Sequence, residues 1–131
     1  MKNNKTLLML LCLFLLSTEA QSQQMYFLNL NGPLKKADLD GSNVETLISS
    51  GFSTVRDLEI DEAAGKMYWT SEGHKKISRA NLDGTGVEDI VTGLNRPVAL
   101  ALDLVNNKVY WTELNQNKIM RSDLDGSNVE D

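Results

Sequence analysis

The feature that most constrains this 131-residue chain is a repeat with a period of about 42 residues. The segment Lys66–Thr70 (KMYWT) returns almost unchanged at Lys108–Thr112 (KVYWT), and a weaker copy (MYFL) lies at Met25–Leu28. The three tyrosines, at positions 26, 68 and 110, are evenly spaced. Periods of this length are typical of solenoids and propellers, in which copies of one small unit stack on one another.

Two further markers keep the same register. A Leu-Asp-Gly tripeptide occurs at 39–41, 82–84 and 124–126, and the segment Leu58–Asp61 returns as Leu100–Asp103. Three markers in register divide the chain into units at 25–65, 66–107 and 108–131.

Short apolar segments alternate with turn signals along each unit, and no segment has a sustained helical period. The strands that we predict are 25–30, 34–40, 44–48, 55–61, 66–70, 76–82, 87–91, 98–102, 108–112 and 119–124. Four strands in about 42 residues are typical of one blade of a β-propeller. The sequence therefore predicts an all-β fold.

Residues 1–20 have the pattern of a secretory signal peptide. Lys2 and Lys5 are basic, Thr6–Ser17 is an apolar run, and Thr18-Glu19-Ala20 offers a cleavage site. The alternative is a membrane anchor, but 12 residues fall short of the ~20 that span a bilayer. We predict export, to the periplasm or the extracellular space, of a domain at 21–131 that is not membrane-bound once the signal is removed.

Composition narrows the function of that exported domain. The only cysteine of the chain, Cys12, lies in the signal peptide and would be removed with it. Disulfides and thiolate metal sites are therefore excluded from the exported domain. The full chain has 13 basic and 18 acidic residues, and removal of Lys2, Lys5 and Glu19 leaves 11 and 17. An acidic chain without a basic block is unsuited to nucleic acids.

The repeats resemble the YWTD family, also called low-density lipoprotein receptor class B repeats. Beside the YWT triplets, segments 77–84 and 119–126 resemble its I-x-R-x-x-L-D-G pattern, and 96–103 resembles R-P-x-x-L-A-L-D. The residues that match the motif are Tyr26, Tyr68, Trp69, Thr70, Arg79, Asp83, Gly84, Asp103, Tyr110, Trp111, Thr112, Arg121, Asp125 and Gly126. At the fourth motif position, where the family has Asp and usually makes a polar tie, this chain has Ser71 and Glu113.

The resemblance implies a partial six-bladed β-propeller of about three four-stranded blades, with the first and last incomplete. In this family the first blade begins without its innermost strand, which the far end of the chain usually supplies. We interpret the chain as part of a larger propeller. In an alternative interpretation, two chains supply three blades each, and the open flanks of a half-propeller invite such self-association.

The residues offer no catalytic, cofactor or metal site. An EF-hand alignment of the first Asp-Gly segment would put Lys36 at the first ligand position, so the Asp-Gly segments are predicted to be hairpin turns. His74 is the only histidine and cannot form a multi-histidine zinc site. Trp69 and Trp111 are expected to pack between blades, and Arg79 and Arg121 to pair with carboxylates, for which Asp61 and Asp103 are candidates.

We therefore expect a non-enzymatic module that binds a protein or peptide through one face. The contacts are expected in three loops at equivalent places, 29–33, 71–75 and 113–117. The candidate residues are Asn31, Glu72, His74, Glu113, Asn115 and Gln116. The alternatives are a lactonase- or lyase-type propeller enzyme with part of its site in missing blades, and a purely structural domain of a larger secreted protein.

Overall fold

The computed structural model describes residues 12–14 and 23–131, so the predicted signal peptide lies outside the described residues except at 12–14. The strands are β1 Cys12–Phe14, β2 Gln24–Phe27, β3 Leu34–Asp38, β4 Glu45–Ile48, β5 Val55–Asp61, β6 Lys66–Ser71, β7 Lys76–Asn81, β8 Glu88–Thr92, β9 Pro97–Asp103, β10 Lys108–Glu113 and β11 Lys118–Asp123. A 3-10 turn, η1 Leu114–Gln116, separates the last two strands. No helix in the described part of the chain has the length and apolar character needed to cross a membrane.

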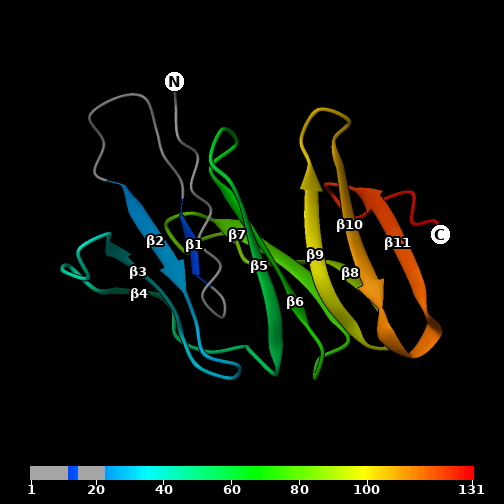
Figure 1. The fold of residues 1–131 in the computed structure, drawn as a ribbon, viewed down its shortest axis with the longest axis horizontal. Coiled ribbons are helices and arrows are strands. Elements are labelled where there is room, and N and C mark those ends of the chain that lie inside the picture. The colour runs from blue at the N-terminus through cyan, green and yellow to red at the C-terminus, as the bar shows by residue number, and fades with distance from the viewer. Residues whose placement is uncertain (1–11, 15–22) are drawn as a thin grey trace.

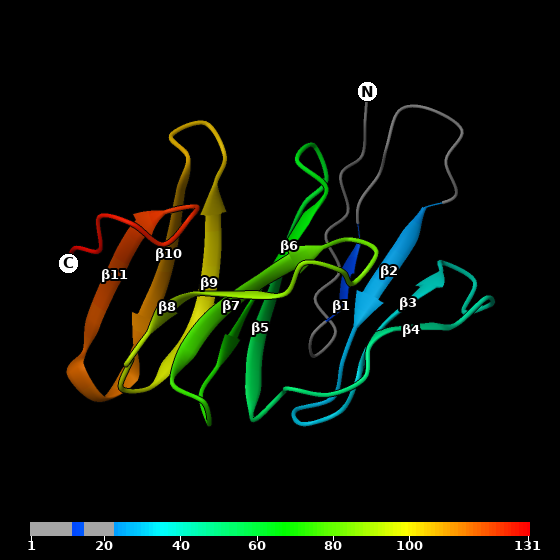
Figure 2. The ribbon, with the colours of Figure 1, turned by 180° about the vertical axis from the view of Figure 1, so that it is seen from behind.

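The strands form three antiparallel sheets that follow the chain in order. The first blade is β1–β4, the second is β5–β8, and the third is the three-stranded sheet β9–β11. The sheets lie side by side in sequence order, as both views show (Figures 1 and 2). The predicted all-β fold of propeller blades is thereby confirmed, and each of the second and third blades begins with the last strand of the preceding repeat unit, β5 or β9.

The first blade differs from the prediction at its inner edge. Cys12–Phe14 forms β1, which pairs antiparallel with β2 in the place predicted to lack a strand. The free edge of β2 would otherwise expose unpaired N–H and C=O groups, and such an edge accepts any extended segment within reach. The third blade is incomplete as predicted, with only an isolated bridge between Arg121 and Glu130 beyond β11.

The Asp-Gly segments are hairpin turns, as predicted. Gly41, Gly84 and Gly126 have φ angles of 83°, 85° and 86°, which non-glycine residues rarely adopt. Two of these glycines also allow neighbouring blades to approach closely. A Cβ on Gly84 would lie 2.5 Å from the Leu47 carbonyl oxygen of the first blade, and one on Gly126 would lie 1.9 Å from that of Ile90 in the second.

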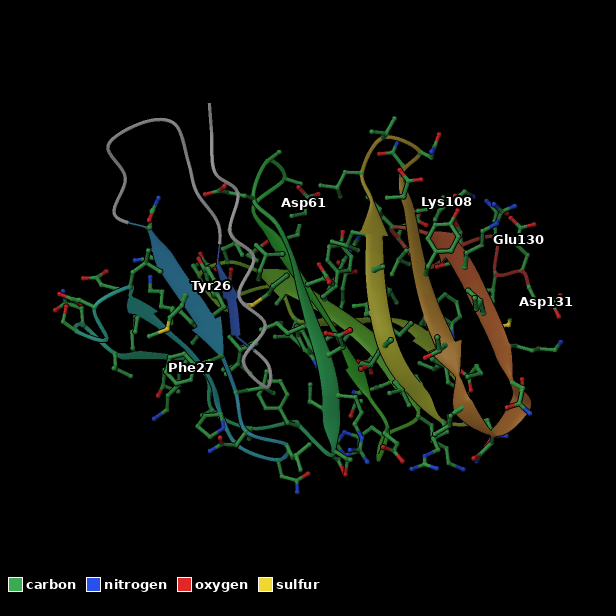
Figure 3. The ribbon with its side chains drawn as sticks, viewed as in Figure 1. Tyr26, Phe27, Asp61, Lys108, Glu130 and Asp131 are labelled. Carbon is green, nitrogen blue, oxygen red and sulfur yellow. The ribbon has the colours of Figure 1, made fainter. Side chains whose placement is uncertain are left out.

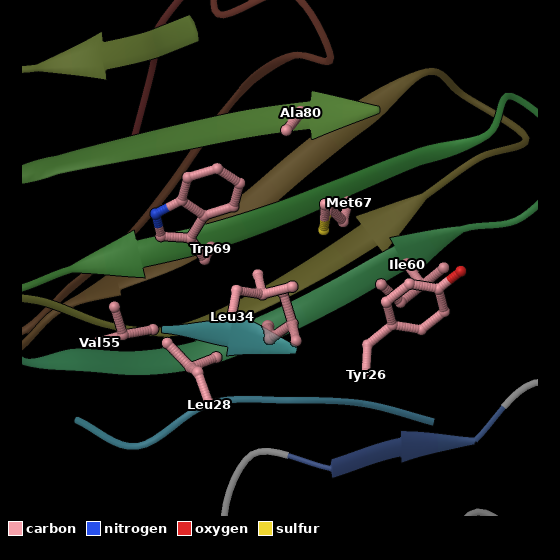
Figure 4. Close-up of a cluster of buried hydrophobic side chains, with 9 residues drawn as sticks. Tyr26, Leu28, Leu34, Val55, Ile60, Met67, Trp69 and Ala80 are labelled. Atoms are coloured by element: carbon pink, nitrogen blue, oxygen red, sulfur yellow. The ribbon is translucent and has the colours of Figure 1, made fainter. Parts of the chain in front are cut away.

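The first and second blades share one hydrophobic cluster (Figure 4). Met67 and Trp69 on β6 point into this cluster, where they meet Tyr26, Leu28 and Leu34 of the first blade. Tyr68, between Met67 and Trp69, belongs to a different cluster because successive side chains of a strand point to opposite faces. β6 is therefore buried on both faces, which explains its run of large residues.

The second and third blades share the other cluster. Tyr68 and Ile77 of the second blade pack with Leu100, Val109 and Trp111 of the third. Both tryptophans thus lie between blades, which confirms the packing role predicted from their equivalent positions.

The inter-blade clusters generate a stability prediction. Leu34 is 0% exposed between the first two blades, whereas Leu104, on the turn between β9 and β10, is 44% exposed. We expect Leu34→Ala to lower the free energy of unfolding by about 2–5 kcal/mol because it leaves a cavity. The matched Leu104→Ala change should cost less than about 0.5 kcal/mol. Urea titrations followed by tryptophan fluorescence measure both, and equal losses would contradict this account of the core.

Candidate functional site

The two ends of the blades carry different loops. At the lower edge in Figure 1, the segments 28–33, 49–54, 72–75, 93–96 and 114–117 form what we call the loop rim. The opposite ends of the strands carry the turn rim, formed by segments 39–44, 62–65, 82–87, 104–107 and 124–129. The three loops predicted to hold contact residues all belong to the loop rim.

Hydrogen bonds join neighbouring segments of the loop rim into a continuous surface. The Val55 amide donates to the Leu30 carbonyl at 2.8 Å, and the Glu72 amide donates to the Thr54 carbonyl at 3.0 Å. The same link recurs between the next pairs of segments. The Leu94 amide donates to the Lys75 carbonyl at 2.9 Å, and the Leu114 amide to the Arg96 carbonyl at 3.0 Å. Segments far apart in sequence are thus held in fixed relative positions.

The two rims also differ in charge. The loop-rim segments contain one acidic residue, Glu72, and two basic residues, Lys75 and Arg96, together with six Asn or Gln side chains. The turn-rim segments contain four acidic residues and no basic one; the acidic residues are Asp40, Glu62, Asp83 and Asp125. The loop rim is therefore the less acidic end of an acidic chain.

A charged cluster joins the second and third blades at the loop rim. Glu72 accepts a hydrogen bond from Nε of Arg56 and another from Nε of Arg96 at 2.7 Å. The Arg56 hydrogen bond is the main cause of a lowered pKa for the Glu72 carboxyl. One carboxylate shared by two guanidiniums leaves the cluster with net positive charge. Glu72, predicted as a contact residue, is thus occupied by two neighbours.

Glu113 is directed inward rather than toward a partner. Its side chain is 2% exposed, and one carboxylate oxygen accepts the backbone amides of Asn95 and Arg96, each at 2.9 Å. The other oxygen accepts the indole N–H of Trp111 at 3.1 Å. Glu113 therefore makes the polar tie expected of the fourth motif position, and its prediction as a surface contact is corrected.

Ser71 occupies the same position in the second blade and makes a smaller tie. Its hydroxyl donates to the Ser53 carbonyl at 2.9 Å. The side chain is too short to accept the indole N–H of Trp69, which is buried without a hydrogen-bond partner among the residues that the structure describes. Such an unsatisfied donor costs about 1–3 kcal/mol. Phe52 packs against this indole with ring centroids 5.6 Å apart.

The other predicted contact residues lie on the loop-rim surface. Asn31, His74, Asn115 and Gln116 are exposed. The Asn31 side-chain oxygen accepts the Thr54 amide at 2.6 Å, and the Asn115 amide group donates to the Asn95 side chain at 3.2 Å. The structure thus brings these four residues to one rim, which sequence spacing had indicated.

The predicted arginine partners are wrong. Arg79 pairs with Glu88 at 2.6 Å and Arg121 with Glu130 at 2.9 Å. Each pair faces across adjacent strands or a bridge, whereas Asp61 and Asp103 are the last residues of β5 and β9. There each carboxylate accepts a backbone amide three residues on, from Ala64 and Asn106 respectively. Arg79 Nη1 also donates to the Leu124 carbonyl of the third blade at 2.8 Å.

Two carboxylates on the inner strand β5 were missed by the sequence analysis. Asp57 accepts the Leu100 amide of β9 at 2.8 Å and so ties the inner strands of two blades. Glu59, two residues on and thus on the same strand face, is partly buried, and desolvation together with the nearby Asp57 charge raises its pKa to about 7. In the third blade the equivalent positions are Ala99 and Ala101, and this difference between otherwise similar repeats was the available signal.

Within residues 12–14 and 23–131, no three His, Cys, Asp or Glu side chains are grouped as metal ligands would be. The described loop rim carries amide groups, Glu72, His74, Lys75, Arg96 and a few apolar side chains, with Arg56 of β5 beside them. Such groups recognise other polypeptides through hydrogen bonds and contact area.

The sequence and fold can be compared with known proteins. A family model described as low-density lipoprotein receptor repeat class B matches residues 107–131. The low-density lipoprotein receptor-related protein 1 of Pyricularia oryzae is 40% identical over 60 residues, which cover 44% of this chain and 19% of that protein. Nidogen-2 of Mus musculus is 36% identical over 69 residues, which cover 51% of this chain and 5% of that protein.

Solved structures share the fold. A chain in the crystal structure of a nidogen/laminin complex superposes with a TM-score of 0.75 at 26% identity, covering 83% of this chain and 43% of that chain. Virginiamycin B lyase from Staphylococcus aureus has a TM-score of 0.68 over 89% of this chain and 39% of that chain. At 18% identity, the lyase shows the fold alone.

The fold and the inter-blade packing define a protein built from β-propeller blades. More narrowly, residues 107–131 match a low-density lipoprotein receptor class B repeat, the YWTD type, and the chain is similar to proteins that carry such repeats. The chain spans a small part of the curated relatives above and less than half of the matched structures.

The hydrogen bonds made by Glu113 and Ser71, at the fourth motif position, predict that removing the two side chains lowers the free energy of unfolding by different amounts. Glu113→Ala removes the acceptor of one buried donor, the Trp111 indole, and of two partly buried amides, so we expect it to lower the free energy of unfolding by about 3 kcal/mol. Ser71→Ala at the equivalent position removes one hydrogen bond and should cost about 1 kcal/mol. Chemical denaturation compares the two. A Ser71→Ala loss as large as that of Glu113→Ala would contradict the assigned roles.

The raised pKa of Glu59 predicts that the stability of the fold depends on pH. Its pKa in the fold, about 7, lies above its usual value of 4.5, so the folded state binds this proton more tightly. Its contribution to stability is therefore greatest below pH 4.5 and is lost as the pH rises through 7. We expect Glu59→Gln to raise Tm at pH 8, with the advantage over wild type shrinking toward pH 5. A difference in Tm that is constant from pH 5 to 8 would contradict this.

Proposed function

We propose that this chain is an exported, non-enzymatic β-propeller module that binds a protein or peptide partner through the loop rim. The observation that carries the proposal is the loop rim itself. Its hydrogen bonds hold loops of all three blades in one surface, which presents exposed amide side chains and the Arg56–Glu72–Arg96 cluster.

The side chains on this surface suit a polypeptide ligand. Leu30 and Leu114 are 44% and 51% exposed and supply apolar area, while Asn31, Asn115 and Gln116 can pair with a backbone. Arg56 and Arg96 remain partly exposed beside Glu72, so their guanidiniums can contact a carboxylate of the partner. Interfaces typically combine an apolar centre with arginine and polar groups in this way.

The comparisons support the same proposal. A structure with the same fold is part of a nidogen/laminin complex, and curated relatives include a nidogen and a lipoprotein receptor-related protein. Protein binding by a class B repeat propeller therefore has a precedent. Export of this chain is supported by the basic and apolar pattern of residues 1–20.

The test is selection of peptides from a random phage-displayed library on the purified chain, followed by fluorescence anisotropy with a selected, labelled peptide. We expect Asn115→Ala combined with Gln116→Ala to weaken binding about tenfold, which corresponds to about 1.4 kcal/mol. The matched control, Asn106→Ala combined with Asn107→Ala on the turn rim, should leave the affinity unchanged. Binding that is lost in the turn-rim variant, or the absence of any selected peptide, would overturn the proposal.

A further inference from the structure

Two of the four arginines of the chain lie at or beside the loop rim. Arg56 is on β5, and Arg96 is in the segment that precedes β9. The other two, Arg79 and Arg121, lie within β7 and β11. Each of the four donates a hydrogen bond from Nε to a glutamate. The two pairs of arginines differ in how they use their remaining donors.

The arginines within β7 and β11 use a second donor inside the molecule. Nη1 of Arg79 donates to the Leu124 carbonyl at 2.8 Å, and Nη1 of Arg121 donates to the Tyr110 hydroxyl at 3.5 Å. Among the residues that the structure describes, the Nη groups of the two loop-rim arginines have no hydrogen-bond partner. A guanidinium carries its donors in a fixed fork, so most donors of both groups remain available to a ligand.

The carboxylate that joins the two loop-rim arginines is less exposed than the arginines themselves. The side chain of Glu72 is 18% exposed, against 36% for Arg56 and 39% for Arg96. The hydrogen bond from Arg56, followed by that from Arg96, lowers the pKa of the Glu72 carboxyl, which is therefore ionised at neutral pH. Two positive groups and one negative group leave a net positive charge, and the arginines present it to solvent.

Both guanidiniums are attached to backbone that is held in place. Arg56 belongs to β5, which pairs with β6. The Arg96 amide donates to the Glu113 carboxylate at 2.9 Å, and the Arg96 carbonyl accepts the Leu114 amide at 3.0 Å. The shared Glu72 then orients the two side chains relative to each other. A ligand therefore meets two guanidiniums that are already oriented, which lowers the entropy lost on binding.

An exposed apolar side chain adjoins this pair of arginines. Leu114, whose amide donates to the Arg96 carbonyl, is 51% exposed on η1. The exposed Asn115 and Gln116 follow it in the same turn. A ligand that brings an anionic group to the arginines can thus place apolar and polar groups on neighbouring residues, as a peptide segment does and a simple anion does not.

We propose that Arg56 and Arg96 together bind the carboxylate of an aspartate or glutamate side chain in the ligand, with an apolar residue of the same ligand against Leu114. This inference rests on the peptide-binding function proposed above and names the chemical class of the partner, an acidic peptide segment. Guanidiniums bind carboxylates through two parallel N–H···O bonds, and the Nη groups provide the donors. A lysine ammonium lacks this fork, so positive charge alone does not reproduce the contact.

The first test selects peptides from one random phage-displayed library on the full chain and, in parallel, on the Arg56→Gln/Arg96→Gln variant. The displayed peptides have no free carboxyl end, so an enriched carboxylate belongs to a side chain. We expect Asp or Glu to be enriched at least fivefold at one position on the wild-type chain and not on the variant. Selected peptides without an acidic preference would overturn this inference while the binding function stands. The absence of any selected peptide would overturn both.

Fluorescence anisotropy with one labelled acidic peptide from that selection measures the contact itself. We expect Arg56→Gln/Arg96→Gln to raise the dissociation constant at least tenfold, and replacement of the acidic residue of the peptide by its amide to do the same. The matched control, Lys66→Gln/Lys108→Gln, removes the same charge at the turn-rim ends of β6 and β10, where Figure 3 labels Lys108. It should change the affinity less than twofold, and an equal loss in the control would contradict a local contact.

A charge-conserving variant separates recognition by the guanidinium fork from attraction by charge. Arg56→Lys/Arg96→Lys keeps both positive charges, yet we expect it to weaken binding of the same peptide at least tenfold. Wild-type affinity in this variant, folded by circular dichroism, would overturn recognition by the fork. If the double variant does not fold, Arg56→Lys alone replaces it, with the same expectation.

Competition with small anions tests the chemical class of the ligand. We expect sodium acetate to displace the labelled peptide from the wild-type chain at lower concentrations than sodium phosphate of equal ionic strength. Displacement by phosphate at concentrations where acetate has no effect would assign the arginines to phosphorylated ligands and overturn the carboxylate assignment.

Discussion

Packing of one blade against the next is the interaction on which the rest of this structure depends. Each sheet is too small to bury both of its faces alone, and its strands place large apolar residues on both sides. On β6, Met67 and Trp69 contact the preceding blade while Tyr68 contacts the following one. Apolar burial at about 25 cal/mol per Å² makes such clusters the main source of stability in the described part of the chain, where no long helix occurs.

The polar ties between blades are secondary to this packing but determine its register. Asp57 accepts an amide of β9, Thr70 donates to the Val98 carbonyl, and Arg79 reaches the Leu124 carbonyl. These contacts join the strands of different blades at inner, middle and outer positions. Because the blades are held in register, the loops at their ends also hold fixed relative positions, and a binding surface can be built from segments far apart in sequence.

The repeats differ from one another mainly in polar residues at equivalent positions. Glu113 accepts hydrogen bonds from three donors, whereas Ser71 at the equivalent position donates one. The indole N–H of Trp111 in the third blade therefore has an acceptor, but that of Trp69 in the second has none among the described residues. Asp57 and Glu59 have no acidic counterparts in the third blade, where alanines stand. The strands agree between repeats because packing constrains them, and most differences lie at polar positions that packing does not decide.

The sequence by itself determined the all-β fold and the positions of ten strands to within three residues, because the tyrosine, Leu-Asp-Gly and Leu-x-x-Asp markers depend on local turns and alternation. Tertiary structure decided which copy of a residue is buried. Ile77 and Ile119 occupy the same repeat position, yet only Ile77 is covered, since burial depends on whether a blade lies beside it. The inward direction of Glu113, the Glu88 partner of Arg79 and the pairing of β1 with β2 were likewise set by neighbours in space. Local sequence patterns carry no record of such contacts between distant segments.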